Sequence, residues 1–241
     1  PGPASERRVL RFTRAVTVRR PGALYFELKG AGDTKLDMAV YYDGRTLSLR
    51  DDLHGTWAQT PVPATLDDML GDVARRYSMP VPFADVVYSV PYEAFIGPDT
   101  KGGFVGRETI DGVECAHLSY ADVHVGVEVW IPSSGQPLPR RVELVYKRVS
   151  GQPRARMDFT RWDLAPQVAD ATFAFQPRAD TATITIEQLV AVARTDATIG
   201  SVTAWSNNVS LYSVPNSDPG RFLSEPDVVD WVASSLAGEF G

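Results

Sequence analysis

The stretch FVGRETIDGVECAHLSYADVHVGVEVWI, residues 104–131, decides the fold of this chain. Apolar and polar residues alternate along it, and a period of two is typical of half-buried β-strands. Asp111-Gly112 separates the first apolar-polar segment from the second, and Asp-Gly at such a place indicates a hairpin turn. Ala121-Asp122 separates the second segment from the third. The stretch therefore predicts three consecutive antiparallel strands.

Strand alternation sorts the side chains of the second hairpin onto two faces. With Ala121-Asp122 as a two-residue turn, Ser119 faces His124 and Cys115 faces Glu128. One face is then apolar, with Ala116, Leu118, Tyr120, Val123, Val125, Val127, Val129 and Ile131. The other face carries Cys115, His117, Ser119, His124 and Glu128.

Extended segments continue on both sides of this stretch, and Asp43-Gly44 marks one further hairpin turn. The additional strands are expected at 9–12, 15–18, 24–28, 38–42, 46–49, 140–147, 155–162, 170–175 and 183–186. This spacing predicts a mainly β (α+β) fold with a twisted antiparallel sheet or a partial barrel.

One segment changes period and predicts a helix. Five apolar residues recur at helical spacing between Thr65 and Tyr77, namely Leu66, Met69, Leu70, Val73 and Tyr77. Thr65 is the expected N-cap, Asp68 lies three residues later, and Pro80 ends the helix. The helix and the Pro-broken apolar segment after it form an insert at about 64–97. Because a single sheet must cover its apolar face, the insert is expected to cover that face.

The apolar residues of insert and sheet allow two interpretations. If they pack tightly they form a core, and if the sheet curves away they line a pocket for an acyl chain. The candidate lining residues are Met69, Leu70, Val73, Tyr77, Phe83, Tyr88, Tyr92, Phe95, Leu118, Val125, Val127 and Val129.

Catalytic signatures are weak. No G-x-S-x-G elbow, dinucleotide fingerprint or P-loop is present, so no catalytic residue and no cofactor is predicted. The polar face of the second hairpin offers His117, His124, Glu128 and Cys115 as candidate ligands for zinc or copper. The alternative is a solvated sheet face with scattered polar residues.

Composition excludes several classes of protein. The 241 residues include 44% hydrophobic residues, which is enough for a sizeable core. The formal net charge of -6 argues against a nucleic-acid binder. The single cysteine, Cys115, forms no internal disulfide, and no apolar run is long enough to span a bilayer. A signal peptide is presumed to have been removed.

The C-terminal part differs from the rest. Residues 195–220 are rich in Ser, Thr, Asn, Asp and Pro, which is typical of a linker. An amphipathic helix is expected after Ser224, with Trp231 beside its apolar stripe. A helix this short should dock, either on its own sheet or on a partner.

The chain resembles the LolA/LolB-like superfamily of periplasmic lipoprotein carriers, and more closely an uncharacterised predicted periplasmic branch of it. The residues that carry the resemblance are 16–21, 41–47, 105–118, 130–131, 137–141, 162–164 and 173–177. The resemblance implies a curved antiparallel half-barrel sheet with helices plugging its concave face. It also implies a periplasmic or secreted location and an apolar cavity for lipid or lipid-modified protein. It implies no catalytic residues.

Two departures from that superfamily shape the domain division. The helix and strand that usually precede the segment matching 8–20 are missing, and the tail has no counterpart. We therefore expect a LolA-like domain at 1–186 and a C-terminal extension at 187–241.

Three functions remain open at this stage. The first is a non-enzymatic periplasmic module that binds a lipid, lipoprotein or other apolar ligand. The second is an assembly subunit of an envelope or membrane-associated complex, which docks through 195–241 or a sheet edge. The third is a metal-dependent enzyme that uses His117, His124 and Glu128.

Overall fold

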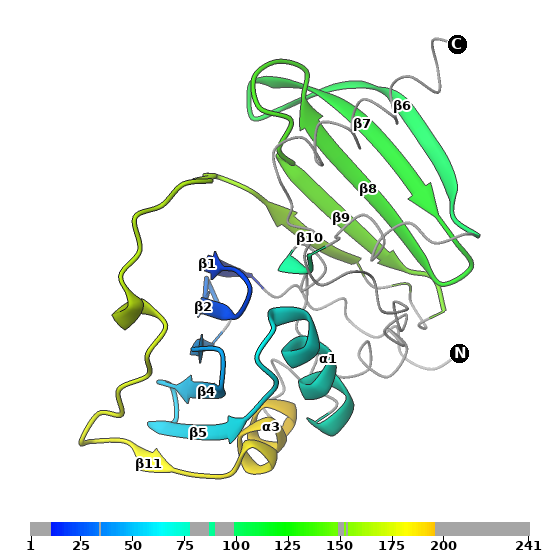
Figure 1. Cartoon of the computed structure of the whole chain (residues 1–241). Coiled ribbons are helices and arrows are strands. Elements are labelled where there is room, and N and C mark those ends of the chain that lie inside the picture. Colours follow the sequence, from blue (N-terminus) through cyan, green and yellow to red (C-terminus); the bar gives the residue numbers. More distant parts are fainter. Residues whose placement is uncertain are drawn as a thin grey trace, which may run out of the picture. The chain divides into compact units, whose positions relative to one another are not determined.

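The described residues of the computed structural model are 11–33, 35–77, 87–89, 99–148, 152 and 154–195. They form two compact units. The first unit holds the described residues up to 77 together with 168–195, and the second holds those from 87 to 167. Each unit contains one sheet (Figure 1).

Sheet A forms the first unit and has the strand order β1-β2-β3-β4-β5-β11. Its strands are β1 (Phe12–Arg19), β2 (Ala23–Gly30), β3 (Asp37–Tyr42), β4 (Thr46–Asp51), β5 (Thr56–Pro61) and β11 (Ala182–Thr183). The first five pair antiparallel, and β11 pairs parallel with β5. The predicted turn at Asp43-Gly44 is confirmed, because the Asp43 carboxylate accepts from the backbone N–H groups of Arg45 and Thr46.

Sheet B forms the second unit and has the order β10-β9-β8-β7-β6. Its strands are β6 (Lys101–Ile110), β7 (Val113–Ala121), β8 (Val125–Pro132), β9 (Arg141–Tyr146) and β10 (Arg154–Asp158), and all neighbours are antiparallel. Asp111 and Gly112 have φ angles of 47° and 80°. Positive φ at both positions is the geometry that Asp-Gly favours in a two-residue hairpin. The mainly β prediction is confirmed, and the strands lie in two sheets, neither of them closed into a barrel.

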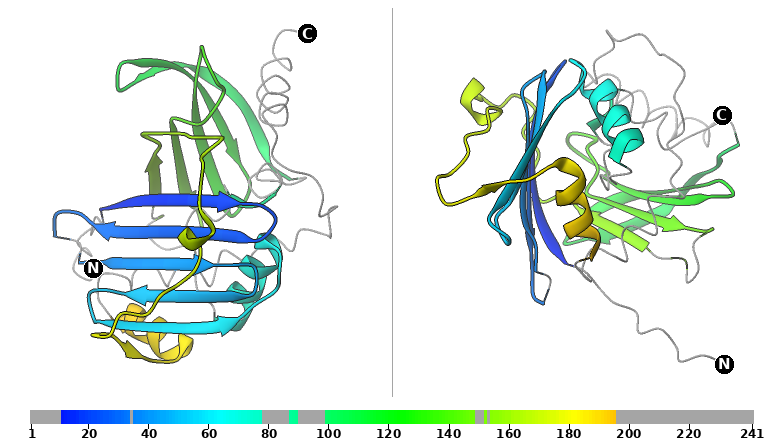
Figure 2. Two further views of the ribbon diagram at one scale, coloured as in Figure 1. Left: turned by 60° about the vertical axis from the view of Figure 1, so that its left-hand side comes forward. Right: turned by 90° about the horizontal axis from the view of Figure 1, so that it is seen from below.

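Two helices lie on one face of sheet A (Figure 2, right). Helix α1 (Leu66–Tyr77) matches the predicted helix, and the backbone N–H of Asp68 donates to Thr65 Oγ1 as expected for an N-cap. Helix α3 (Ile186–Thr195) begins with a capping box, in which Thr185 and Gln188 each accept from the other's backbone N–H. We call this face of sheet A the helix side.

The core of the first unit lies between α3 and the sheet. Ile186, Leu189 and Val190 of α3 pack against Leu49 and Ala58, all of them 6% exposed or less. Burial of these side chains on both partners is what holds a ten-residue helix in place, since a helix this short is marginal alone.

The opposite face of sheet A is crossed by a segment that we call the strap, residues 168–181 (Figure 2). The ring of Phe175 contacts Tyr41 and Trp57, with centroids 5.4 Å and 5.2 Å away. The Arg19 guanidinium lies 4.7 Å from the Phe173 ring centroid, and Phe173 is only 2% exposed. Aromatic packing therefore fastens the strap without strand pairing.

Several predicted elements need correction. The strand expected at 170–175 is a 3-10 turn at Asp170–Thr172, because its apolar side chains pack down onto sheet A while Phe173 N–H bonds back to Asp170. The strand expected at 183–186 is β11 followed at once by α3, and that at 155–162 ends at Asp158. The expected helix near Trp231 lies outside the described residues.

The packing of α3 generates the first prediction. Leu189→Ala should lower the free energy of unfolding by about 2–5 kcal/mol, because it leaves a cavity beneath a fully buried side chain. Urea unfolding followed by circular dichroism measures the loss. Glu187→Ala is the control on the exposed side of the same helix and should cost less than about 1 kcal/mol. Equal effects of the two substitutions would contradict the docking of α3.

Candidate functional site

The predicted apolar residues of α1 lie in the interior of the first unit. Met69, Leu70 and Val73 are 1%, 5% and 1% exposed. Tyr77 packs against the α3 core, and its hydroxyl lies 3.0 Å from Thr60 Oγ1 on β5. These side chains are buried within the unit and leave little surface for a ligand.

The helix side of sheet A nevertheless has an open end. Strand register places one apolar residue from each strand in a single row, Val16–Phe26–Val40–Leu49–Ala58. The α3 end of the row is closed, with Ala58 and Leu49 at 0% and 1% exposure. Phe26 and Val40 are half-buried, and Val16 on the edge strand is 43% exposed. We call the β1 and β2 end of this row, together with Phe12, the edge patch.

A cation lies within the edge patch. Arg14 alternates with Phe12 and Val16 along β1, so its side chain projects from the same face. Its guanidinium carbon lies 4.9 Å from the Phe26 ring centroid and 5.5 Å from that of Phe12. Burial lowers the pKa of Arg14 to about 10, so the group remains charged at neutral pH. The patch thus combines apolar surface with one positive charge.

Sheet B has an apolar face of its own, as alternation predicts. Leu118 pairs with Val129, and Tyr120 with Val127. Leu118, Val127 and Val129 are all 4% exposed or less, whereas Val125 is half-buried.

The candidate residues of the apolar cavity are therefore divided between the two units. Those of α1 belong to the first unit, and those of sheet B to the second, with Tyr88 half-buried among the described residues of the second. Phe83, Tyr92 and Phe95 lie outside the described residues.

The register of the second hairpin differs from the register that a two-residue turn at Ala121-Asp122 would give. Ser119 pairs with Glu128 and His117 with Trp130, a displacement of four residues. The cause is a longer turn, in which the Asp122 carboxylate accepts from the backbone N–H groups of His124 and Val125. An even displacement leaves each strand residue on its predicted face. Val123, expected on the apolar face, lies in the turn and is 66% exposed.

The polar face of sheet B carries a hydrogen-bonded network across three strands. His117 Nε2 lies 2.7 Å from Glu128 Oε2, and His117 Nδ1 lies 2.9 Å from Glu108 Oε1. Ser119 donates to Glu128, and the Trp130 indole donates to Glu108. The His117 and Trp130 rings are stacked with centroids 4.4 Å apart. Both imidazole nitrogens donate to ionised carboxylates only when the ring is an imidazolium.

The four candidate metal ligands do not gather around one point, and this network engages two of them. His117 and Glu128 are brought together, but they bond directly to each other. Cys115 is fully buried against Ile110 and Trp130, its thiol directed to the Val113 carbonyl, and burial raises the pKa of that thiol. His124 lies in the turn before β8. Within the described ranges, no three His, Cys, Asp or Glu residues are arranged to hold a metal ion.

Two functional candidates escaped the sequence reasoning. Arg14 sits between apolar positions of one strand, so alternation alone could have placed it on the apolar face. Glu108 could also have been placed, because the Asp111-Gly112 turn sets it opposite Cys115, on the face of the sheet that carries His117.

Comparison with known protein families gives a match over most of the chain. The sequence profile of a family described as "Predicted periplasmic protein (DUF2092)" matches residues 6–187. No curated protein matches the chain. No helix among the described residues is long and apolar enough to cross a membrane. The family description agrees with the expected periplasmic location and with the predicted periplasmic branch named above.

The His117 network generates the second prediction. Glu128→Ala should lower the free energy of unfolding by about 1–2 kcal/mol, because Ser119 and His117 both lose a partner. Glu143→Ala is the matched control on β9. Glu143 lies directly opposite Glu128, and like charges in that position repel, so its removal should be neutral or slightly stabilising. The urea concentrations at the unfolding midpoints of the two variants, taken at a constant m-value, compare their stabilities. A larger loss for Glu143→Ala would contradict the network.

Proposed function

We propose, from the premise that this chain belongs to the DUF2092 family of predicted periplasmic proteins, that it is a non-enzymatic module binding a lipid-like ligand. The ligand lies on the edge patch and carries an acyl chain and an anionic head group. The observation that carries the proposal is the row from Ala58 to Val16, which is closed by α3 at one end and open at the other.

The open end supplies apolar surface. Phe12 is 37% exposed and Val16 is 43% exposed, on the same face as half-buried Phe26. Removing apolar area from water contributes roughly 25 cal/mol per Å², and each buried methylene of a ligand about 0.8 kcal/mol. The affinity for an acyl chain that lies along the open end of the row should therefore rise with each methylene in contact with the patch.

Arg14 selects the head group. A guanidinium held over aromatic rings on an apolar face has lost part of its hydration. A carboxylate or phosphate would form strong hydrogen bonds with it, because such pairs are charge-assisted. The resemblance to the LolA/LolB-like superfamily supports a lipid ligand by analogy of fold, which is weaker support than these contacts.

The assembly hypothesis depends on residues 195–241, nearly all of which lie outside the described ranges. No observation favours it over ligand binding. The metal-enzyme hypothesis gains nothing from the described residues, where His117 bonds to two carboxylates.

The third prediction tests the edge patch. With laurate as the probe in a calorimetric titration, the purified protein should bind, and Val16→Glu should weaken binding at least about tenfold through an unfavourable charge on the patch. Leu53→Glu is the control, because Leu53 is 44% exposed but lies in the turn between β4 and β5. Equal laurate affinity for Val16→Glu and the unsubstituted protein would refute the site.

The fourth prediction tests the head-group preference. Arg14→Gln should weaken laurate about tenfold, which corresponds to one charge-assisted hydrogen bond or pair. The same substitution should leave dodecanol affinity nearly unchanged, since dodecanol offers the same chain without the charge. Equal losses for both ligands would show that Arg14 contributes only packing.

A further inference from the structure

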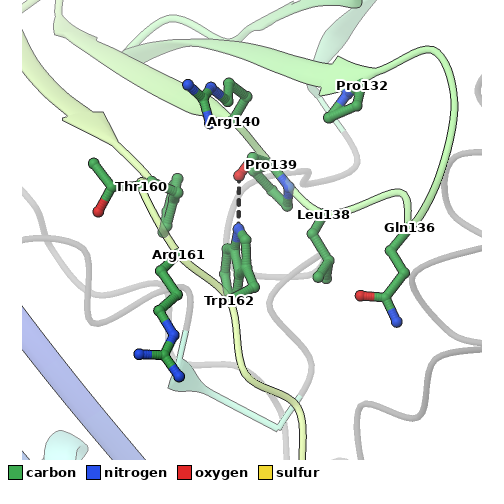
Figure 3. A pocket seen from close by; sticks show the side chains of 9 residues that line it. Pro132, Gln136, Leu138, Pro139, Arg140, Thr160, Arg161 and Trp162 are labelled. Atoms are coloured by element: carbon green, nitrogen blue, oxygen red, sulfur yellow. Dashed lines mark hydrogen bonds between the residues drawn. The ribbon is translucent and has the colours of Figure 1, made fainter. Parts of the chain in front are cut away.

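A separate hollow lies in the second unit, between the loop that follows β8 and the segment that follows β10 (Figure 3). It has a volume of about 190 Å³. Pockets for drug-sized ligands are usually on the order of 300–1,000 Å³, so this one suits a single ring-sized group. None of its lining residues takes part in the edge patch or in the His117 network.

An aromatic pair forms one wall of the hollow. The Phe159 and Trp162 rings are stacked, with centroids 4.7 Å apart and planes inclined by 19°. The indole Nε1–H of Trp162 donates to the Pro139 carbonyl at 2.9 Å. Trp162 is nevertheless 40% exposed. Because its one donor is already used, the indole can offer a ligand only its ring surface.

The other walls are apolar with a polar margin. Leu138 and Pro139 line the hollow beside Trp162, and Gln136 lies beyond Leu138 (Figure 3). An apolar, ring-sized space next to an exposed indole favours an aromatic ring, since aromatic pairs gain about 0.5–1.5 kcal/mol beyond area burial.

Cations at the margin add a charge preference. The Arg161 side chain is 83% exposed and lies 3.5 Å from Asp163, which is longer than an ordinary hydrogen bond. Arg140 also lines the hollow, and its guanidinium is 3.5 Å from the Asp111 carboxylate. Each guanidinium carries five N–H donors, so both keep donors for a ligand carboxylate.

We propose that this hollow binds a single aromatic ring bearing a carboxylate. The ring stacks on the exposed surface of Trp162 beside Leu138, and the carboxylate accepts hydrogen bonds from Arg161 at the margin. This site is independent of the lipid site, so the chain holds a second ligand of different chemistry.

The test uses the full chain, isotope-labelled, with phenylacetate as the probe. The indole N–H signal of Trp162, assigned by its loss in Trp162→Phe, should shift saturably with a Kd on the order of 1 mM, as expected for so small a ligand. Arg161→Gln should weaken phenylacetate binding about tenfold. Arg107→Gln is the matched control, because Arg107 is a half-exposed arginine on β6 that does not line the hollow.

Three further arms decide the chemistry. Trp162→Ala, followed through other shifting signals, should weaken phenylacetate binding at least about tenfold, because the ligand ring loses the surface on which it stacks. Benzyl alcohol, which lacks the charge, should bind at least about tenfold more weakly. The proposal would be overturned by an absence of saturable shifts with phenylacetate, or by benzyl alcohol binding as tightly as phenylacetate. Equal effects of Arg161→Gln and Arg107→Gln would also overturn it. Tighter binding of glucuronate than of phenylacetate would indicate a sugar acid instead.

Discussion

The alternation of side chains along a strand is the constraint on which this structure depends. Each sheet acquires one apolar face that must be covered, and it is the completeness of that cover that differs along sheet A. Helix α3 closes the row at Leu49 and Ala58, while Val16 at the edge strand remains open. The proposed binding surface lies where the cover ends, and most of it is made of ordinary apolar residues.

Local interactions made much of this fold predictable from sequence. Asp43-Gly44 and Asp111-Gly112 form the expected turns, and Thr65 caps α1, because each feature depends on neighbours within four residues. Helix α3 carried an equally local signal in Thr185 and Gln188. The alternation of Thr and Ile at 183–186 favours a strand, and this signal competes with the capping box at the same place.

Interactions distant in sequence were predictable only in part. His117 bonds to Glu108 and Glu128 on its two neighbouring strands, and both contacts depend on register. A longer turn at Asp122 displaces the pairing of β7 with β8 by four residues. The pairing of β6 with β7 follows from the Asp111-Gly112 turn as far as Gly106, and the register irregularity lies beyond that position. The strap escaped for a related reason, since Phe173 and Phe175 mimic strand alternation. Phe175 packs onto rings from β3 and β5, and Phe173 lies against Arg19 of β1.

Arginine beside aromatic rings occurs at both proposed sites, with different consequences. Arg14 is held over Phe12 and Phe26, and its lowered pKa of about 10 reports a cation partly removed from water yet charged throughout the neutral range. Arg161 is almost fully hydrated beside Trp162. An anion at Arg14 meets less competition from water and salt than one at Arg161, because screening weakens exposed pairs most. Binding at the edge patch should therefore resist added salt, whereas binding at the hollow should weaken with it.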